Sequence, residues 1–338
     1  MKSRRPSVAV IGGGSWGTTV ASIAARNTST VLWARSEQTV ADINERHQNS
    51  RYLPDLPLSP GLRATADLAE AVTGADVLVM GVPSQSFRGV AEQIAEHVRP
   101  WVPVVTLVKG LEQGSRKRMT EIVAEVLPGH PAGVLAGPNI AREVVQGYAA
   151  AATIAMPEHR SAELLQDLFR TTRFRVYTTT DVIGVEIAGA LKNIFAIAVG
   201  FGDGLGAGDN TRAMVITRAL RELSRLGVAM GGAPETFIGL AGLGDLIATC
   251  TSPHSRNRRV GVGLAQGKTL DQIAAELNQV AEGVKSAGTV MKLAAEKGVD
   301  MLIAREVDAV INHGQPAADA YRGLLRQAPG HEVHGDAW

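Results

Sequence analysis

The stretch that most constrains the fold lies at residues 8–26, VAVIGGGSWGTTVASIAAR. A short apolar run leads into a glycine turn, and an apolar helical pattern begins directly after it. Gly12, Gly14 and Gly17 give the spacing GxGxxG at this junction. A dinucleotide-binding fold needs glycine there for a tight turn, for close approach of the backbone to a pyrophosphate, and for packing of the helix on the strand. Because amides at a helix start also favour phosphate, the stretch predicts a nucleotide site rather than a purely structural turn.

Short apolar runs alternate with helix-length segments through the first half of the chain, as in a mostly parallel, doubly wound α/β sheet of the Rossmann type. After Asp181 the pattern changes to long helical stretches without intervening strands. We therefore expect a dinucleotide-binding domain over residues 1–182 and an all-helical substrate and catalytic domain over residues 183–338, with a disordered tail from about residue 328. The expected strands lie in VAVIG, TVLWAR, ADVLVMGVP, VPVVTLVKG, AGVLAG and AATIAM.

Charge and cysteine content exclude several classes of partner. Lysine and arginine number 34 and aspartate and glutamate 33, so the net charge of +1 gives no reason to expect DNA, RNA or an anionic membrane as partner. The only cysteine, Cys250, excludes an intrachain disulfide and a multi-cysteine zinc site, and it fits a reducing cytoplasm. We expect it to be a small buried core residue, with a catalytic thiol as the alternative. We expect no metal site, because His331 and His334 belong to a solvated tail.

The segment GVEIAGALKNIFAIAVG, residues 184–200, is apolar on nearly every side and carries Lys192 at its centre. It is too short and too polar for a good membrane span, so we expect a buried helix in a cytoplasmic protein. A helical lysine is usually solvated, but Glu186 and Asn193 make too narrow a stripe for a solvated face. Burial penalises the ammonium form and lowers a lysine pKa toward neutral pH. Lys192 is therefore our candidate proton-transfer group.

Ligands of open parallel sheets lie beyond the carboxyl ends of the strands. Lys109, Gly137 and Asn139 follow expected strands and are candidates for that edge. Arg35 ends the second expected strand, where a protein specific for NAD typically carries an acidic residue that binds the ribose 2'-hydroxyl. An arginine suits a 2'-phosphate, so we expect NADP as cofactor, while the nearby Glu37 keeps NAD open.

A glycine-rich stretch, GLAGLGDLIATCTSPHSRNRRVGVGLA, supplies Asp245 and then Ser255, Arg256 and Asn257 ahead of an expected helix. A serine N-cap, a guanidinium fork and an amide together suit a phosphate dianion. The alternative is an ordinary basic helix face. We interpret His254 as a structural or loop residue rather than as an acid–base group.

Seven blocks of the sequence together resemble bacterial NAD(P)-dependent glycerol-3-phosphate dehydrogenases. The resemblance covers nearly the whole chain, and the long blocks are far more specific than the glycine spacing alone. The blocks are GGGSWGTTVA, VPSQSFR, VKGLE, AGPNIAREV, EIAGALKNIFAIAVGFGDGLGAGDNTRA, GLAGLGDLIATCTSPHSRNRRVG and VAEGVKSA.

The resemblance implies hydride transfer between sn-glycerol 3-phosphate and dihydroxyacetone phosphate, a homodimer, and a product that feeds phospholipid synthesis. It implies Lys192 as the proton acceptor. Asn139 departs from the family, which has a substrate-contacting serine there; an amide can still donate a hydrogen bond, so we keep the contact. The implied substrate contacts are Lys109, Gly137, Lys192, Asp245, Ser255, Arg256 and Asn257. The implied cofactor contacts are Ser15, Trp16, Arg35, Lys109, Ala141, Arg256, Val280 and Glu282.

Other functions compete with this interpretation. A ketopantoate reductase or a hydroxyacid dehydrogenase shares the two-domain plan, but the phosphate-like HSRN stretch argues against both. A nucleotide-sugar dehydrogenase needs a catalytic cysteine, and no base partner is evident near Cys250. An NADP-sensing protein without catalysis has no need of both Lys192 and Asp245.

Overall fold

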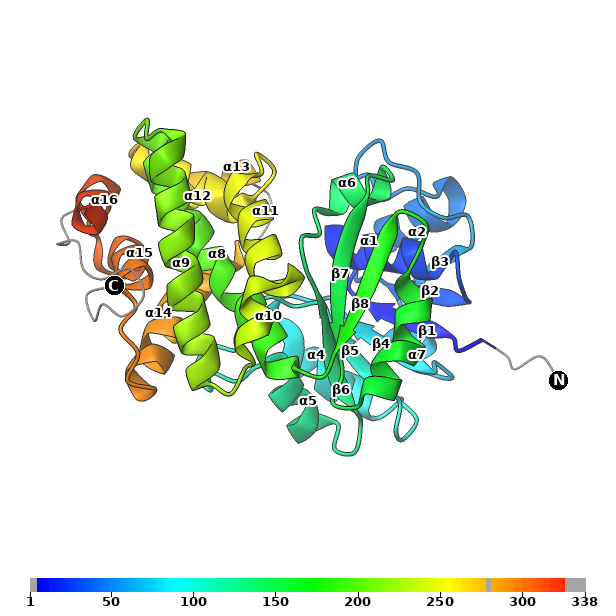
Figure 1. Ribbon diagram of the computed structural model, residues 1–338. Helices are drawn as coiled ribbons and strands as arrows, with labels where there is room; N and C mark the ends of the chain where they lie inside the picture. Colours follow the sequence, from blue (N-terminus) through cyan, green and yellow to red (C-terminus); the bar gives the residue numbers. More distant parts are fainter. Residues whose placement is uncertain (1–4, 278–280, 326–338) are drawn as a thin grey trace. The chain divides into compact units, whose positions relative to one another are not determined.

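The computed structural model describes residues 5–277 and 281–325, and the chain divides into two compact units (Figure 1). Unit 1 comprises Met1–Val108 and Lys117–Val182, and unit 2 comprises Lys109–Arg116 and Ile183–Trp338. The segment Lys109–Arg116 differs from the expectation, which placed all of residues 1–182 in one domain. Contacts along this segment join it to unit 2: Asn193 Nδ2 donates to Lys109 O at 2.8 Å, and Gln113 Nε2 donates to Lys285 O at 2.9 Å.

Unit 1 is built on one eight-stranded sheet with the order β3-β2-β1-β4-β5-β6-β7-β8 (Figure 1). Neighbouring strands are parallel except β6 and β7, which are antiparallel. The mostly parallel order confirms the expected fold class, and it reverses at β1, which lies between β2 and β4. The strands are β1 (Val8–Ile11), β2 (Thr30–Trp33), β3 (Leu62–Thr65), β4 (Val77–Met80), β5 (Val104–Thr106), β6 (Ala132–Ala136), β7 (Ala150–Ala155) and β8 (Phe174–Thr179).

Helices cover the sheet of unit 1, and alternate strand residues enter two different apolar clusters. In β1, Val8 and Val10 belong to one cluster, while Ala9 and Ile11 belong to the other. Strands that are buried on both faces form continuous apolar runs, which is why the sequence indicated most of them. The helical segments are α1 (Ser15–Ala24), α2 (Glu37–Arg46), α3 (Leu68–Val72), the 3-10 turn η1 (Ser84–Ser86), α4 (Phe87–Ala95), α5 (Met119–Val126), α6 (Ala141–Val145) and α7 (His159–Phe169).

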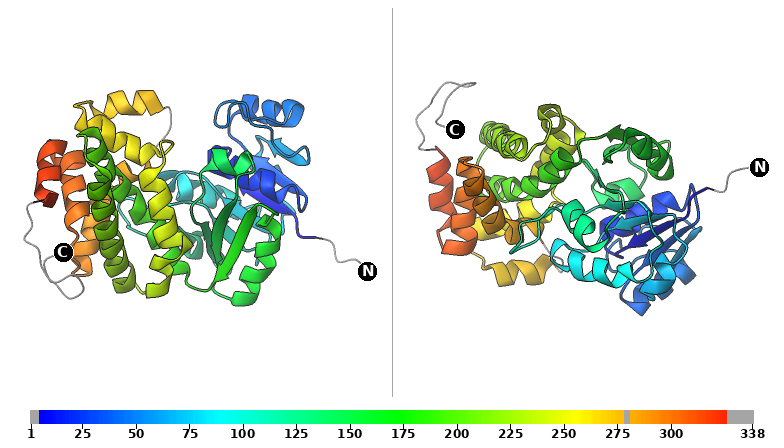
Figure 2. Two further views of the ribbon diagram at one scale, coloured as in Figure 1. Left: turned by 45° about the horizontal axis from the view of Figure 1, so that its top comes forward. Right: turned by 90° about the horizontal axis from the view of Figure 1, so that it is seen from below.

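From Ile183 onward, the described secondary structure of unit 2 is entirely helical, which confirms the expectation for this part of the chain; the segment Lys109–Arg116 is a loop. α15 packs against α14 and α16, and the three lie side by side in Figure 2. The segments are α8 (Val182–Gly204), α9 (Asp209–Ala229), α10 (Pro234–Ile238), the π-helical turn η2 (Leu240–Gly244), α11 (Asp245–Thr251), α12 (Arg256–Ala265), α13 (Leu270–Leu277), α14 (Glu282–Glu296), α15 (Leu302–His313) and α16 (Ala317–Leu325).

The helix α8 forms the centre of the core of unit 2. Every residue from 184 to 202 is buried, including the polar ones. The helix has the length and apolarity of a membrane span, but 89% of its most apolar window is buried inside the protein. Burial on all sides is the condition of a core helix, as the sequence predicted.

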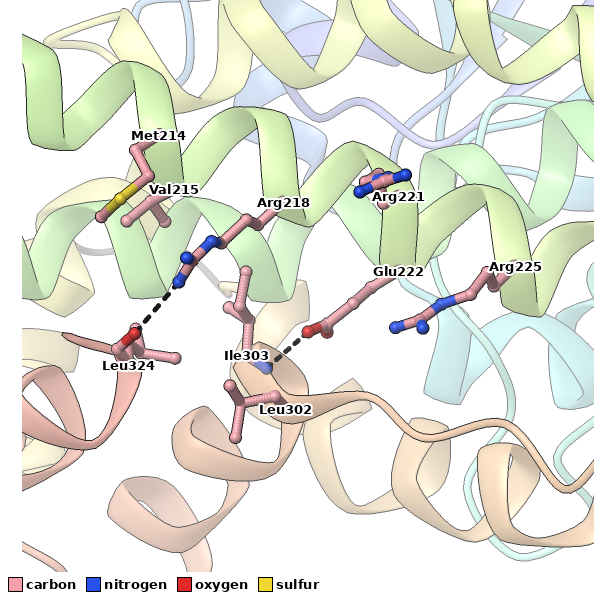
Figure 3. Close-up of a pocket in the computed structure, with 9 residues that line it drawn as sticks. All are labelled: Met214, Val215, Arg218, Arg221, Glu222, Arg225, Leu302, Ile303 and Leu324. Carbon is pink, nitrogen blue, oxygen red and sulfur yellow. Dashed lines mark hydrogen bonds between the residues drawn. The ribbon is translucent and has the colours of Figure 1, made fainter. Parts of the chain in front are cut away.

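Polar contacts join α9 to α15 and α16 around a small pocket (Figure 3). The Glu222 carboxylate accepts from the backbone N–H of Ile303 at 2.8 Å and of Ala304 at 3.3 Å, and so caps α15. Burial raises the pKa of this carboxyl to about 7. Arg218 Nη1 donates to Leu324 O at 3.1 Å and ties α9 to α16. Side chains of α9 thus fix α15 and α16, two helices that come much later in the sequence.

Candidate active site

Lys192 lies in the middle of α8 and is 5% exposed. Its ammonium group donates to Asp245 Oδ1 in a short contact, and to Thr249 Oγ1 at 2.7 Å. Lys109 Nζ donates to the other carboxylate oxygen, Asp245 Oδ2, at 2.7 Å. One carboxylate, itself 1% exposed, therefore lies between two lysines. The structure brings together three of the predicted substrate residues from segments that are far apart in the sequence.

The electrostatics of this cluster favour proton exchange at Lys192. The pKa of Lys192 is lowered to about 7, mainly by burial; the Asp245 carboxylate raises this pKa, and the charge of Lys109 lowers it. Removing an ammonium group from water disfavours its charged form, and a carboxylate at contact distance restores only part of that loss. The direction and cause of the shift agree with the sequence prediction. A lysine with this pKa exchanges protons near neutral pH.

Asp245 is positioned by an irregular turn. The π-helical turn η2 ends at Gly244, directly before Asp245 begins α11. A Cβ on Gly242 would lie 2.1 Å from the carbonyl oxygen of Phe237, so this turn accepts only glycine there. Local π-helical geometry frequently marks functional sites, because it re-aims the side chains that follow. The glycine-rich block of the sequence thus serves to direct one carboxylate.

Sequence reasoning missed Thr249 and Asn193. Thr249 lies four residues after Asp245 on α11, so both side chains share one face of the helix, and this spacing was an available signal. Asn193 joins two of the predicted residues: it donates to the backbone oxygen of Lys109 and accepts from the side chain of Asn257, Nδ2, at 2.9 Å. No local pattern could have paired residues so far apart in the chain.

The first turn of α12 carries the residues that we predicted to bind phosphate. Ser255 is the N-cap, as expected, and its Oγ accepts from Arg258 N at 3.3 Å. Arg256 is exposed to solvent. Asn257 is buried, and its Oδ1 accepts from Gly283 N at 3.0 Å while its nitrogen binds Asn193. A phosphate contact from Asn257 therefore has to use its second amide hydrogen.

The glycine turn of unit 1 fits a nucleotide. A Cβ on Gly12 would lie 2.7 Å from Gly81 O, and one on Gly17 would lie 2.0 Å from Gly12 O. At Gly14, by contrast, an added Cβ meets no described atom within 4 Å, and no side chain caps the start of α1. The first turn of α1 thus leaves its amides and open space for a pyrophosphate, as the spacing GxGxxG predicted.

The side chains around this turn differ in exposure. Ser15 Oγ donates to Tyr52 O at 3.1 Å. Trp16 Nε1 is buried and has no hydrogen-bond partner among the described residues. Arg35 follows β2 and is exposed, as is Glu37 at the start of α2. Both therefore remain available to a ribose.

The remaining predicted residues lie in both units. Gly137 follows β6 with φ of 146°, a conformation that favours glycine. With its amide nitrogen turned toward the backbone, Asn139 donates to Ala151 O at 3.1 Å and to Pro138 O at 3.2 Å. Ala141 begins α6 and Glu282 begins α14. Val280 lies outside the described residues, and so do His331 and His334.

Cys250 is the core residue that the sequence predicted. It is fully buried on α11, and burial raises the pKa of its thiol to about 12. We expect no reaction of the folded protein with a thiol reagent such as Ellman's reagent at pH 8, and one thiol per chain after unfolding in guanidinium chloride. Reaction in the native state would contradict the buried, protonated thiol.

Comparison with known families identifies the family to which this chain belongs. Residues 7–162 match the family model described as the N-terminus of NAD-dependent glycerol-3-phosphate dehydrogenase, and residues 181–322 match the model described as its C-terminus. The chain belongs to the NAD-dependent glycerol-3-phosphate dehydrogenase family. The resemblance seen in the sequence is thereby confirmed.

Individual members of the glycerol-3-phosphate dehydrogenase family match over almost the full length. A relative from Mycobacterium avium (strain 104), named glycerol-3-phosphate dehydrogenase (NAD(P)+), is 66% identical over 336 residues, which are 99% of this chain and 98% of the relative. A relative of the same name, numbered 2, from Sphingopyxis alaskensis is 59% identical over 98% of this chain and 99% of its own. The crystal structure of the Coxiella burnetii glycerol-3-phosphate dehydrogenase superposes with a TM-score of 0.91 at 35% identity, covering 96% of this chain and 99% of that one.

The ketopantoate reductases, the alternative considered from the sequence, share only the fold with this chain. A ketopantoate reductase from Ralstonia eutropha superposes with a TM-score of 0.60 at 16% identity. A likeness at this level shows a common architecture and says nothing of substrate.

Proposed function

We propose that this member of the glycerol-3-phosphate dehydrogenase family interconverts sn-glycerol 3-phosphate and dihydroxyacetone phosphate, with Lys192 as the proton donor and acceptor. The chain is an NAD(P)-dependent oxidoreductase. The observation that carries the proposal is the buried cluster in which Asp245 holds Lys192 and Lys109. Such a cluster keeps a lysine both oriented and able to change its charge near neutral pH.

Lys192 acts on the oxygen at C2 of the substrate. In the direction of ketone reduction its ammonium form donates a proton to the developing alkoxide, and in the direction of alcohol oxidation its neutral form accepts the hydroxyl proton. Asp245 and Thr249 fix the position of the nitrogen through the contacts described above. Lys109 lowers the pKa of Lys192 and contributes a second positive group near the substrate oxygens.

The phosphate of the substrate is held away from the reacting carbon. Arg256 supplies a guanidinium at the start of α12, and the serine-capped first turn beside it favours an anion. Gly137 and Asn139 complete the expected substrate contacts; because the amide nitrogen of Asn139 donates to two backbone carbonyls, its contact uses Oδ1, which accepts from a substrate hydroxyl. A remote anchor of this kind orients the carbonyl and converts binding energy into rate.

The cofactor is NADP(H), with NAD as the alternative. When bound, its nicotinamide supplies or takes the hydride. The residues that would hold it are the glycines of the first turn, Arg35 at the 2'-phosphate, and the contacts implied by family resemblance: Ser15, Trp16, Lys109, Ala141, Arg256, Val280 and Glu282. Gly14 and the uncapped start of α1 support this assignment, because they leave room and amides for phosphate.

The wider role of the protein follows from the same proposal. The region 1–182 binds the cofactor and the region 183–338 binds substrate and carries the catalytic lysine. The protein acts in the cytoplasm as a homodimer, and its product supplies phospholipid synthesis. The single buried thiol and the burial of α8 support a cytoplasmic location.

The experiment that tests the function is NADPH and NADH consumption with dihydroxyacetone phosphate, beside phosphate-free dihydroxyacetone. We expect the phosphate to raise kcat/KM strongly above a slow but measurable turnover of dihydroxyacetone. We also expect faster turnover with NADPH, because an arginine at the position of Arg35 suits the 2'-phosphate. Faster turnover with NADH would contradict the assignment of Arg35 and favour Glu37. Absence of phosphate-dependent turnover with either cofactor would reject the dehydrogenase activity.

A further inference from the structure

The helices α8 and α12 meet backbone to backbone. A Cβ on Gly200 of α8 would lie 2.2 Å from the carbonyl oxygen of Arg258, and a Cβ on Gly261 of α12 would lie 2.1 Å from that of Ile197. Neither position accepts a larger residue without moving a helix. Because α8 carries Lys192 and α12 begins with Arg256, this contact brings the proton-transfer helix and the phosphate-binding helix together.

A contact between glycines has no side chains to stop one helix from rotating or sliding on the other. At this crossing, ion pairs of Asp203 restrain the helices instead. Asp203, near the end of α8, has a side chain that is 7% exposed, and its Oδ2 accepts from Arg258 Nε at 2.5 Å. Its Oδ1 accepts from Arg212 of α9, from Nη2 at 2.8 Å and from Nε at 3.0 Å. Both oxygens of one carboxylate are thus occupied by arginines from two different helices.

The first turn of α12 is therefore fixed at two points along α8. Asn257 binds Asn193, the neighbour of Lys192, and Arg258 binds Asp203 ten residues further along, or about 15 Å at the rise of an α-helix. Residues two apart in a helix point in nearly opposite directions, about 200° around the axis. Holding Arg258 against Asp203 thus directs Arg256 to the other side of α12, where it is exposed.

We propose that the ion pair of Asp203 and Arg258 is a positioning device that sets the phosphate-binding turn of α12 at a fixed distance and rotation from Lys192. The inference rests on the proposed function and deepens it. Arg258 acts through Arg256 and Asn257 rather than on the substrate. Its loss leaves Lys192 and its carboxylate in place, but it lets the anchor that holds the phosphate shift. Small displacements of such an anchor cost rate steeply, because the reacting oxygen is no longer aligned with the proton donor.

The test compares two arginines that share one carboxylate. Arg258→Met breaks the contact on α12, while the control Arg212→Met removes the same charge from Asp203 on the side of α9, together with the ion pair of Arg212 and Asp209. Arg258→Lys keeps the charge and one donor. For each variant, kcat and KM are measured with dihydroxyacetone phosphate, and kcat/KM is measured with phosphate-free dihydroxyacetone, both at saturating NADPH. Thermal unfolding reports whether each variant is folded.

We expect Arg258→Met to lower kcat/KM for dihydroxyacetone phosphate between about tenfold and a hundredfold. The value for dihydroxyacetone should stay within about twofold, because that substrate does not use the anchor. Arg258→Lys should recover part of the loss, and Arg212→Met should remain within about threefold of the unaltered enzyme for both substrates. If Arg258→Met does not fold, the phosphate-selective loss is sought in Arg258→Lys.

Equal losses for the two substrates would mean a general structural role and would overturn the inference, as would an Arg212→Met variant that is as impaired as Arg258→Met. The comparison of variants is made only if the unaltered enzyme itself shows phosphate-dependent NADPH oxidation. An inactive unaltered protein would reject the proposed function itself, and the inference with it.

Discussion

Replacing Lys192 by methionine is expected to lower kcat for the reduction of dihydroxyacetone phosphate by about a thousandfold, since the variant has no group that can donate a proton at C2. Methionine fills a similar volume in the apolar core around α8, and Asp245 keeps Lys109 as its partner. The fold should therefore persist. Steady-state NADPH oxidation measures the loss, and quenching of protein fluorescence by NADPH checks that cofactor affinity is unchanged. A kcat within tenfold of the unaltered enzyme would reject Lys192 as the proton donor.

The pH dependence of the unaltered enzyme follows from the same residue. The pKa of Lys192 is lowered to about 7, mainly by burial. Ketone reduction needs the ammonium form, so its rate should be highest below pH 7 and fall as the pH rises through that value. Alcohol oxidation needs the neutral amine, so its rate should rise over the same interval. A rate of ketone reduction that falls with pH and a rate of alcohol oxidation that rises with pH, over the same interval, identify a single titrating group. The residual activity of the methionine variant should show neither pH dependence.

Replacing Asp245 by asparagine should impair both activity and stability. The carboxylate raises the pKa of Lys192 against the effects of burial and of Lys109, so its loss moves this pKa further below 7. At pH 7.5 the rate of ketone reduction should then fall, and the midpoint of its pH profile should shift to lower pH. Breaking a buried ion pair on one side costs about 3–5 kcal/mol of unfolding free energy, which urea denaturation measures.

The matched control for this variant is Asp271→Asn on α13, the same chemical change at an exposed position. Its pH profile should equal that of the unaltered protein, and its unfolding free energy should fall by no more than about 1 kcal/mol, because Asp271 lies in the first turn of α13. An Asp245→Asn variant whose pH midpoint does not move, or moves upward, would contradict the electrostatic role of the carboxylate.

The sequence predicted those parts of the fold that depend on local pattern. β1 and β4 are buried on both faces and form continuous apolar runs, while α8 is apolar all round. β3 and β8 were not predicted, because exposed residues interrupt their buried ones. In β8 buried Phe174 and Val176 alternate with exposed Arg175 and Tyr177, so no apolar run forms, although the two-residue period itself was present.

The site likewise contains residues that the sequence predicts and contacts that it does not. The buried lysine was predictable, because its neighbours on α8 leave no face for water. Ser255 was predictable as a cap from the helix that follows it. The approach of Asn193 to Asn257, and of Asp203 to Arg258, depends on how helices cross, and no local pattern encodes that. The excursion of Lys109–Arg116 into unit 2 was unpredictable for the same reason.

Because Lys109–Arg116 belongs to unit 2, a single cut in the sequence cannot separate the two units. A gene fragment that encodes only residues 183–338 lacks Lys109, and with it both the second cation on Asp245 and the carbonyl that Asn193 binds. Exchange of helical regions between homologous genes by a single crossover would separate the two lysines in the same manner. An intact cluster of the two lysines and Asp245 requires two crossovers or a matched eight-residue graft of Lys109–Arg116. The cluster of Lys192, Asp245 and Lys109 is thus inherited as two pieces of sequence, and one of them lies inside the part of the gene that encodes unit 1.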